Sequence, residues 1–257
     1  MNKEIKKLKK AILAMEEVTS VVLKEGYEIT SIKELGLILW IDRTFAGLKS
    51  AEVILDKLHF EPMLDHSLGL IFRSIITDFF LVMNILGHAK SKDDVEPILI
   101  HYFKDGEKKM DSFINTMERT GRYPEDMVSQ IRKNLKDVSN FRGLIREDYL
   151  LKIEVPILTT KIFESLASNP LILEQKIFSL VLHAFDLWKF YCQYEHYSLS
   201  YYEFTRKPKG PIFNSRIISI IDISFVIFGF CLKNLGREDL EEKITSFHAA
   251  ELNRISN

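Results

Sequence analysis

Residues 65–89 are the segment that most constrains how this chain can fold, because they are apolar on nearly every side of a helix. The apolar residues are spread round the helix instead of forming one stripe. A helix without a polar face is buried on all sides. We therefore expect a central helix at about residues 65–89, enclosed by other helices. Its apolar residues are Leu68, Leu70, Ile71, Phe72, Ile75, Ile76, Phe79, Phe80, Leu81, Val82, Met83, Ile85 and Leu86.

The rest of the chain predicts one helix after another, since apolar residues recur at spacings of three and four. The 11 Gly and 7 Pro among 257 residues are too few for a β-sandwich or barrel, which needs many tight turns. Residues 139–156 have weak periodicity and predict no definite element. We expect an all-α bundle of about eight to ten helices in a single domain, residues 1–257. The further helices are expected at about 5–26, 31–59, 91–121, 124–138, 157–168, 214–236 and 237–254.

A second unusual segment predicts one very long helix, at about residues 170–205. Asn169 suits its cap and Pro170 its first helical position, and no Gly or Pro follows before Pro208. At 1.5 Å per residue such a helix spans roughly 50 Å. Its first half is apolar, whereas its second half, from Tyr191 to Glu203, is rich in Tyr, His and Ser. We expect the functional site at this polar end.

Composition excludes several classes of protein. The 35 Lys and Arg against 36 Asp and Glu lack the basic excess of a dedicated nucleic-acid binder. Cys192 and Cys231 are too far apart for a CxxC zinc site or a disulfide framework, and the N-terminus does not resemble a signal peptide, so a cytoplasmic location is expected. The apolar run 217–232 is interrupted by Asp222 and is shorter than the roughly 20 residues of a spanning helix. It predicts a buried core helix, with no membrane partner.

Polar residues within the central helix are the first candidates for a binding site. Arg73 and Asp78 are five residues apart, about 140° round a helix, so they cannot pair with each other. Each therefore needs a partner on another helix, because an unpaired buried charge costs several kcal/mol. We expect the Arg73 guanidinium to be buried and paired with a carboxylate or with carbonyls of another helix. The alternative is that both residues belong to a structural network of the core, which is the commoner case.

The long helix supplies the remaining candidates. Lys189, Gln193, His196, Ser200 and Glu203 are spaced four, three, four and three residues apart, which places them on one polar stripe. His183 and Asp186 form a second polar pair nearer its start. The stripe is equally typical of a solvated helix face, and a lone His–Asp pair is more often structural than metal-binding. The chain has no His-Glu-x-x-His, Walker, GxGxxG or GxSxG motif, so we expect no cofactor and no metal.

Three segments resemble a bacterial HEPN-like helical family of unknown function. Leu70-Ile-Phe-Arg73-Ser-Ile-Ile-Thr-Asp78 is similar to that family's helix in which Arg follows Leu and precedes an acid. Lys161-Ile-Phe-Glu-Ser-Leu and the Tyr-rich stretch 194–204 are similar to its later half, with Ser198 or Ser200 as the matching Ser. The family's terminal His is not matched. The resemblance covers about residues 30–205 and implies a HEPN-like core at about 30–235, with the terminal helices packed on it.

Two functions follow from these patterns. The first is a non-catalytic module that binds a partner protein or a small polar ligand at the Tyr/His/Ser end of the long helix, as a monomer or a homodimer. The second, implied by the resemblance, is an RNA-acting protein in bacterial defence or toxin–antitoxin systems. HEPN ribonucleases use Arg-x4-His, and no Arg precedes any of the seven histidines at that spacing. We therefore favour the non-catalytic module.

Overall fold

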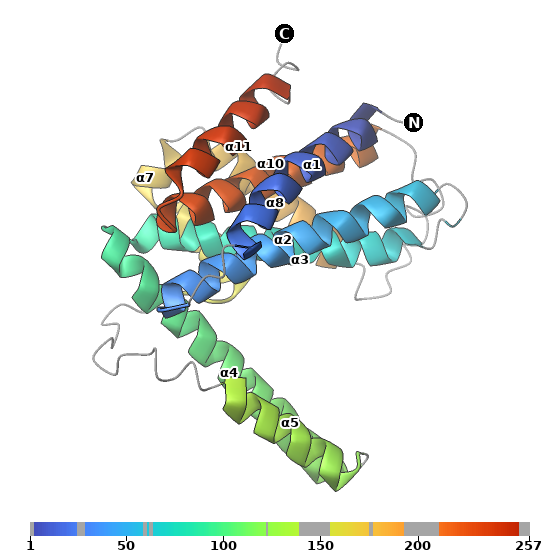
Figure 1. Ribbon diagram of the computed structural model, residues 1–257, viewed down its shortest axis with the longest axis vertical. Helices are drawn as coiled ribbons and strands as arrows, with labels where there is room; N and C mark the ends of the chain where they lie inside the picture. The colour runs from blue at the N-terminus through green and yellow to red at the C-terminus, as the bar shows by residue number, and fades with distance from the viewer. Residues whose placement is uncertain are drawn as a thin grey trace. The chain divides into compact units, whose positions relative to one another are not determined.

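The computed structural model describes residues 3–24, 29–58, 61, 64–121, 123–138, 155–174, 177–192 and 211–251 (Figure 1). This part of the chain contains nine α-helices of nine or more residues, the four-residue α7, one 3₁₀ turn and no strand. The all-α prediction is confirmed. The elements are α1 (Lys3–Lys24), α2 (Ile32–Lys57), α3 (Leu64–His88), η1 (Lys92–Asp94), α4 (Val95–Thr120), α5 (Glu125–Val138), α6 (Thr159–Ala167), α7 (Pro170–Leu173), α8 (Ile177–Cys192), α10 (Pro211–Asn234) and α11 (Glu238–Glu251).

The chain divides into two compact units. Unit 1 comprises Met1–Tyr27, Leu37–Gly87 and Pro156–Asn257, and unit 2 comprises Glu28–Gly36 and His88–Val155. Unit 1 contains α1, most of α2, α3 and all helices from α6 onward, whereas unit 2 is built round α4 and α5. The expectation of one domain over residues 1–257 stays a prediction.

The α3 helix is central to unit 1, as its apolar sequence predicts. Gly47 of α2 lies so close to it that an added Cβ would stand 3.2 Å from the Cδ1 atom of Ile75. On the α8 side the rings of Phe72 and Tyr191 meet at 5.9 Å between centroids. One expectation is corrected: α3 is not buried on all sides, because its Ser67, Leu70 and Ser74 are exposed. Because Leu70 is apolar, the sequence pattern does not predict that this side of α3 is exposed.

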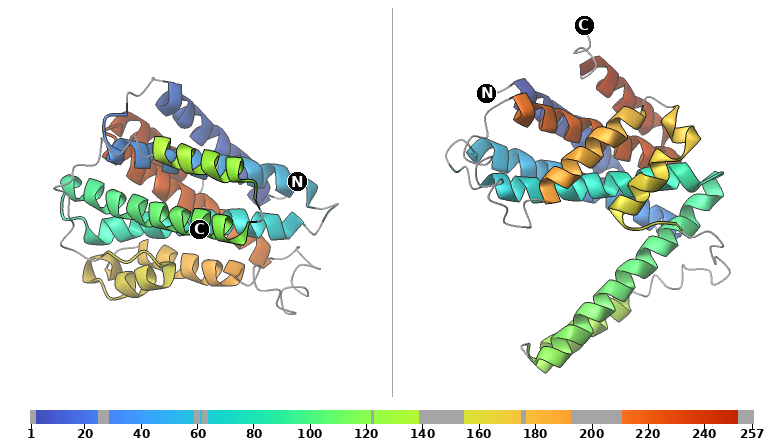
Figure 2. Two further views of the ribbon diagram at one scale, coloured as in Figure 1. Left: turned by 90° about the horizontal axis from the view of Figure 1, so that it is seen from below. Right: turned by 180° about the vertical axis from the view of Figure 1, so that it is seen from behind.

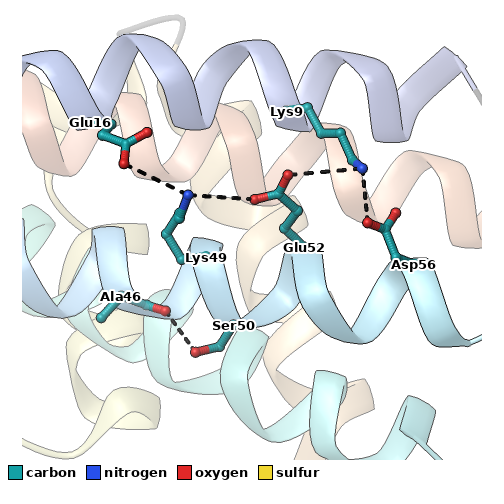
Figure 3. A network of polar contacts seen from close by, with 7 residues as sticks. All are labelled: Lys9, Glu16, Ala46, Lys49, Ser50, Glu52 and Asp56. Atoms are coloured by element: carbon teal, nitrogen blue, oxygen red, sulfur yellow. Dashed lines mark hydrogen bonds and ion pairs between the residues drawn. The ribbon is translucent and has the colours of Figure 1, made fainter.

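The α1 helix packs on α10 and α11 and is joined to α2 by a row of ion pairs (Figure 3). Lys9 Nζ lies 2.9 Å from an Asp56 carboxylate oxygen and 3.9 Å from Glu52. Lys49 Nζ lies 3.8 Å from Glu16 and 3.9 Å from Glu52. Water screens the attraction between charges at the surface, so such pairs contribute little to the free energy of unfolding. Their main effect is to align α1 with α2, and they add little to the stability of the fold.

The single long helix expected at about residues 170–205 is not observed. Instead α7 ends at Leu173, Glu174 lies in a turn, and α8 begins at Ile177. No Gly or Pro lies between α7 and α8. Asn169 Nδ2 donates a hydrogen bond to the Gly87 carbonyl at 3.0 Å, which fixes the start of α7 against the end of α3. The second half of the predicted helix, 193–205, lies outside the described residues.

Two helices, Leu64–His88 and Ser215–Asn234, are long and apolar enough to cross a membrane by length and composition alone. Within their most apolar windows, 67% and 72% of the residues are buried inside the structure. Core helices of soluble proteins have the same composition, which makes the match weak evidence for a membrane span. The expectation that residues 217–232 form a buried core helix is confirmed, since Ile217, Ile220 and Phe228 are fully buried.

Unit 2 contains a helical hairpin formed by α4 and α5, which lie side by side (Figure 2). Ser91 begins this region as expected. Its side chain accepts a hydrogen bond from the Asp93 amide, while the Asp94 carboxylate accepts one from the Ser91 amide. At the other end Gly121 stops α4 with a φ of 56°, a left-handed conformation that favours glycine. Residues 139–154 lie outside the described part of the chain.

Candidate functional site

Aromatic side chains of α8 hold that helix against its neighbours in unit 1. The ring of Phe185 stacks on Phe163 of α6 at 3.8 Å between centroids and meets Phe80 of α3 edge-on at 6.1 Å. The Trp188 ring is nearly parallel to that of Phe185, at 6.0 Å between centroids. Each such pair adds about 0.5–1.5 kcal/mol to the area that it buries. The aromatic residues thus fix which faces of α8 are covered and which stay exposed.

Cationic groups lie over these rings. The Arg73 guanidinium carbon is 5.8 Å from the Trp188 ring centroid, and Lys189 Nζ is 4.7 Å from that of Phe185. Cation–π contacts of this kind contribute about 0.5–1 kcal/mol where exposed and about 2 kcal/mol where desolvated. We call Arg73, Phe185, Trp188 and Lys189 the cation–aromatic face. It joins α3 to α8, as the position of Arg73 in the central helix led us to expect.

Arg73 differs from its prediction in one respect, because its side chain is half-buried and not buried. It lies next to the outward stripe of α3, and its guanidinium reaches α8 along the rim of the core. Cys192, at the end of α8, lies close to it. Burial raises the pKa of the Cys192 thiol, and the nearby Arg73 charge opposes that rise. Arg73 therefore supplies positive charge at the rim, within reach of solvent.

Asp78 is the second polar candidate of α3. As expected for a buried charge, it pairs with a residue of another helix. Its side chain is 2% exposed, and Arg43 Nη2 of α2 donates a hydrogen bond to it at 2.7 Å. Burial raises the pKa of Asp78 to about 6, although the Arg43 charge lowers it. Sequence reasoning missed Arg43. On an amphipathic helix an outward Arg, 55% exposed here, gives no signal that its guanidinium reaches a buried acid.

A second buried charge cluster lies where α3 and α10 begin and α8 ends. Arg216 is 9% exposed, and its guanidinium lies 4.3 Å from the Phe190 ring centroid and 6.0 Å from that of Tyr191. Burial raises the pKa of the Tyr191 phenol, Arg216 lowers it, and the nearby Asp65 raises it further. Asp65 is itself only 5% exposed. The cluster anchors the two helix ends between which residues 193–210, outside the described part, run.

The remaining candidates on α8 are placed less tightly. His183, Asp186 and Lys189 are all exposed, on one face of the helix. The described part of the chain contains no group of three or more His, Cys, Asp or Glu side chains that could hold a metal ion. Lys189 is the one member of the predicted polar stripe within the described residues. The other members, Gln193, His196, Ser200 and Glu203, lie outside them.

A histidine–aspartate pair that sequence reasoning did not propose joins α10 to α11. His248 Nε2 lies 2.9 Å from an Asp222 carboxylate oxygen, and the imidazole lies 4.7 Å from the Phe225 ring centroid. Both side chains are about a third exposed. The signal was Asp222 itself, since a carboxylate inside an apolar run needs a partner. Contacts on both helices give the pair a structural role in holding α11.

Comparison of the chain with protein-family models, with curated proteins and with solved structures finds no match.

Proposed function

We propose that this chain is a non-catalytic binding module that takes a carboxylate-bearing segment of a partner protein on the cation–aromatic face. The observation that supports the proposal is the pairing of each cation with a ring: Arg73 with Trp188 and Lys189 with Phe185. Cations held in this way are pre-organised to receive a carboxylate, and Arg can do so with two parallel hydrogen bonds.

Trp188 adds a second element to the proposed site. Its indole Nε1 is buried and has no hydrogen-bond acceptor among the described residues. A buried donor without a partner costs about 1–3 kcal/mol. A small turn of the half-buried indole would bring Nε1 to an incoming carboxylate oxygen, and that turn would change the fluorescence of the ring. Trp188 is therefore both part of the site and a probe of it.

Apolar side chains near the face favour a protein segment over a small ion. Leu182 on α8 and Leu70 on α3 are 42% and 39% exposed. Tryptophan and arginine are also the side chains that most often dominate the binding energy of protein interfaces. The stripe expected to continue through Gln193, His196, Ser200 and Glu203 would extend the same surface along the chain.

The test uses the fluorescence of Trp188 in the Trp40→Phe background, which removes the only other tryptophan. Short peptides that combine Glu or Asp with Leu are titrated into this protein. We expect a saturable change that Arg73→Ala and Lys189→Ala each weaken about tenfold, as the loss of one charge-assisted contact predicts. Lys233→Ala, an exposed lysine on α10, should leave the titration unchanged. Equal binding by all variants would contradict the proposal.

RNA is the second candidate ligand, because cations beside aromatic rings also suit phosphates and stacked bases. The HEPN-like resemblance implies the same ligand. The discriminating measurement adds single-stranded and structured RNA to the protein and to its Arg73→Ala and His196→Ala variants. The non-catalytic proposal expects no cleavage. Cleavage that His196→Ala abolishes would replace it with an RNA-cleaving function.

A further inference from the structure

A groove of about 380 Å³ lies between α1 and α11 of unit 1, two helices that take no part in the cation–aromatic face. Its α1 wall is formed by Lys10, Leu13, Ala14 and Glu17. Its α11 wall is formed by Lys243, Ile244 and Phe247. Ligand pockets of proteins measure about 300–1,000 Å³, so the groove has room for one small molecule.

The middle of the groove is apolar. On α11, Ile244 is 2% exposed, and the ring of Phe247 stacks on Phe225 of α10 at 6.0 Å between centroids, which fixes this wall. On α1, Leu13 is 64% exposed although its side chain is apolar. An alkyl chain in the groove would cover Leu13 and contact Phe247, and removing these surfaces from water would stabilise the complex.

Charged side chains stand toward the two ends of the α1 wall. Glu17 forms an ion pair with Lys243, which joins one wall of the groove to the other. Lys10 precedes Glu17 by seven residues, which is about two turns or roughly 10 Å along α1. The ion pair therefore stands at one end of the apolar middle, and Lys10 stands toward the other.

The charges favour an anion at the Lys10 end. Lys10 is exposed, and residues 3–10 of α1 contain five Lys against one Glu. A cluster of like charges raises the local concentration of ions of the opposite sign. The ammonium group of lysine has three N–H donors, so a carboxylate can bond to Lys10 in addition to any partner already there. At the other end Glu17 repels an anion and neutralises Lys243.

We propose that this groove binds a straight-chain monocarboxylate of about eight carbons, with its carboxylate at Lys10 and its alkyl chain between Leu13 and Phe247. An extended chain of about eight carbons is roughly 9 Å long, which matches the distance along α1 from Lys10 to Glu17. A longer chain reaches the Lys243–Glu17 ion pair and gains no further apolar wall. This site is additional to the proposed partner-binding face.

Methyl NMR of the full chain, labelled in Ala, Ile and Leu, measures both the affinity and the place of binding during a titration with octanoate. We expect saturable shifts of the methyl signals of Leu13, Ala14 and Ile244. An open groove that covers about half of each CH2 group, together with one exposed charge pair, predicts a Kd on the order of 0.1–1 mM.

The alkyl chain and the charge of the ligand can be varied separately. A fully buried CH2 group tightens binding about fourfold, so a half-covered one should tighten it about twofold. From butanoate to octanoate the Kd should therefore fall by about twofold per carbon. Decanoate and dodecanoate should bind no more than about twofold more tightly than octanoate. Octylammonium, with the opposite charge on the same chain, should bind at least about tenfold more weakly than octanoate.

Two pairs of variants test the α1 wall. Lys10→Ala should weaken octanoate binding about fivefold, whereas Lys24→Ala, at an exposed position near the end of α1, should leave it unchanged. Leu13→Ser should weaken it about threefold. Its control is Leu23→Ser, which alters a 47% exposed leucine of the same helix outside the groove. All four side chains are exposed, and circular dichroism checks that each variant keeps its helices.

Several results would overturn the proposal. One is a Kd that keeps falling by about twofold per carbon beyond octanoate, which is the behaviour of unspecific association with apolar surface. Equal binding of octylammonium and octanoate, or equal binding by Lys10→Ala and Lys24→Ala, would remove the role of the charge. Shifts at Leu182 without shifts at Leu13 would place the carboxylate near the cation–aromatic face instead. None of the variants alters Arg73 or Trp188, so this proposal stands or fails separately from the partner-binding function.

Discussion

The α3 helix of unit 1 and the α4–α5 hairpin of unit 2 differ in how much of their apolar surface is buried. Neighbouring helices cover α3 on most of its circumference, and even the carboxylate of Asp78 is buried against Arg43. The hairpin covers only one narrow seam, and Phe113 and Met127 remain in solvent. The difference indicates that unit 1 supplies its own core, whereas the hairpin needs further contacts to cover its apolar side chains.

The largest expected difference between the two regions is the loss of stability when a Phe is replaced by Ala in each of them. Phe79 is fully buried in α3 and meets Phe80 at 5.8 Å between ring centroids, so Phe79→Ala should cost about 3–5 kcal/mol in the free energy of unfolding. Phe113→Ala removes the same ring from a half-exposed position and should cost less than about 1 kcal/mol. Urea denaturation followed by circular dichroism measures both. Equal losses of unfolding free energy in the two variants would contradict the difference in burial between the two regions.

The same two regions show how far the sequence predicts the fold. The continuous apolar pattern of 65–89 identified the central helix, and Gly121 identified the end of α4, because both signals are local. The break between α7 and α8 has no local signal. The residue that holds the start of α7, Asn169, bonds to the Gly87 carbonyl 82 residues away. Contacts of that range cannot be inferred from spacing along one helix.

The candidate site was predictable in part for a related reason. A charge in an apolar helix must find a partner, and that requirement predicted a cross-helix contact for Asp78. It could not identify Arg43, which periodicity places on an outward face. The same reasoning placed Arg73 too deep, because Leu70 belongs to the exposed stripe of α3 although it is apolar. Sequence patterns predict which groups need partners more reliably than which groups supply them.

The next prediction concerns the cost of the buried carboxylate in unit 1. The pKa of Asp78 is about 6 in the folded chain and 3.8 for an unperturbed aspartate, so the folded state binds its proton more tightly. Between these two values the wild-type protein loses stability as the pH rises, by about 3 kcal/mol in total. Asp78→Asn removes this dependence while its amide oxygen can still accept from Arg43. Relative to wild type, the variant should therefore gain about 3 kcal/mol between pH 4 and pH 7.

Urea denaturation of both proteins at several pH values measures the difference directly, because effects of all other groups cancel in the comparison. Asp42→Asn, which removes an exposed carboxylate from the helix that carries Arg43, is the matched control for the loss of one negative charge. If the stability of Asp78→Asn followed the wild-type pH curve in parallel, Asp78 would be shown to titrate at an ordinary pKa.

The smallest expected effect tests the polar edge of the hairpin, which Arg132, Asn115 and Glu118 form. Arg132→Ala removes the hydrogen bonds to Asn115 and Glu118, but the Arg132 and Glu118 side chains are 37% and 50% exposed. Water replaces most of what is lost, so the substitution should cost about 0.5–1 kcal/mol. Hydrogen exchange should show slightly faster opening of α4 and α5, less so at high salt, where the charge pair is screened already. Lys133→Ala, one residue further on an exposed position, controls for the loss of a cation from α5. A loss above about 2 kcal/mol would mean that the polar edge, and not the seam of Ile114, Met117 and Val128, holds the hairpin together.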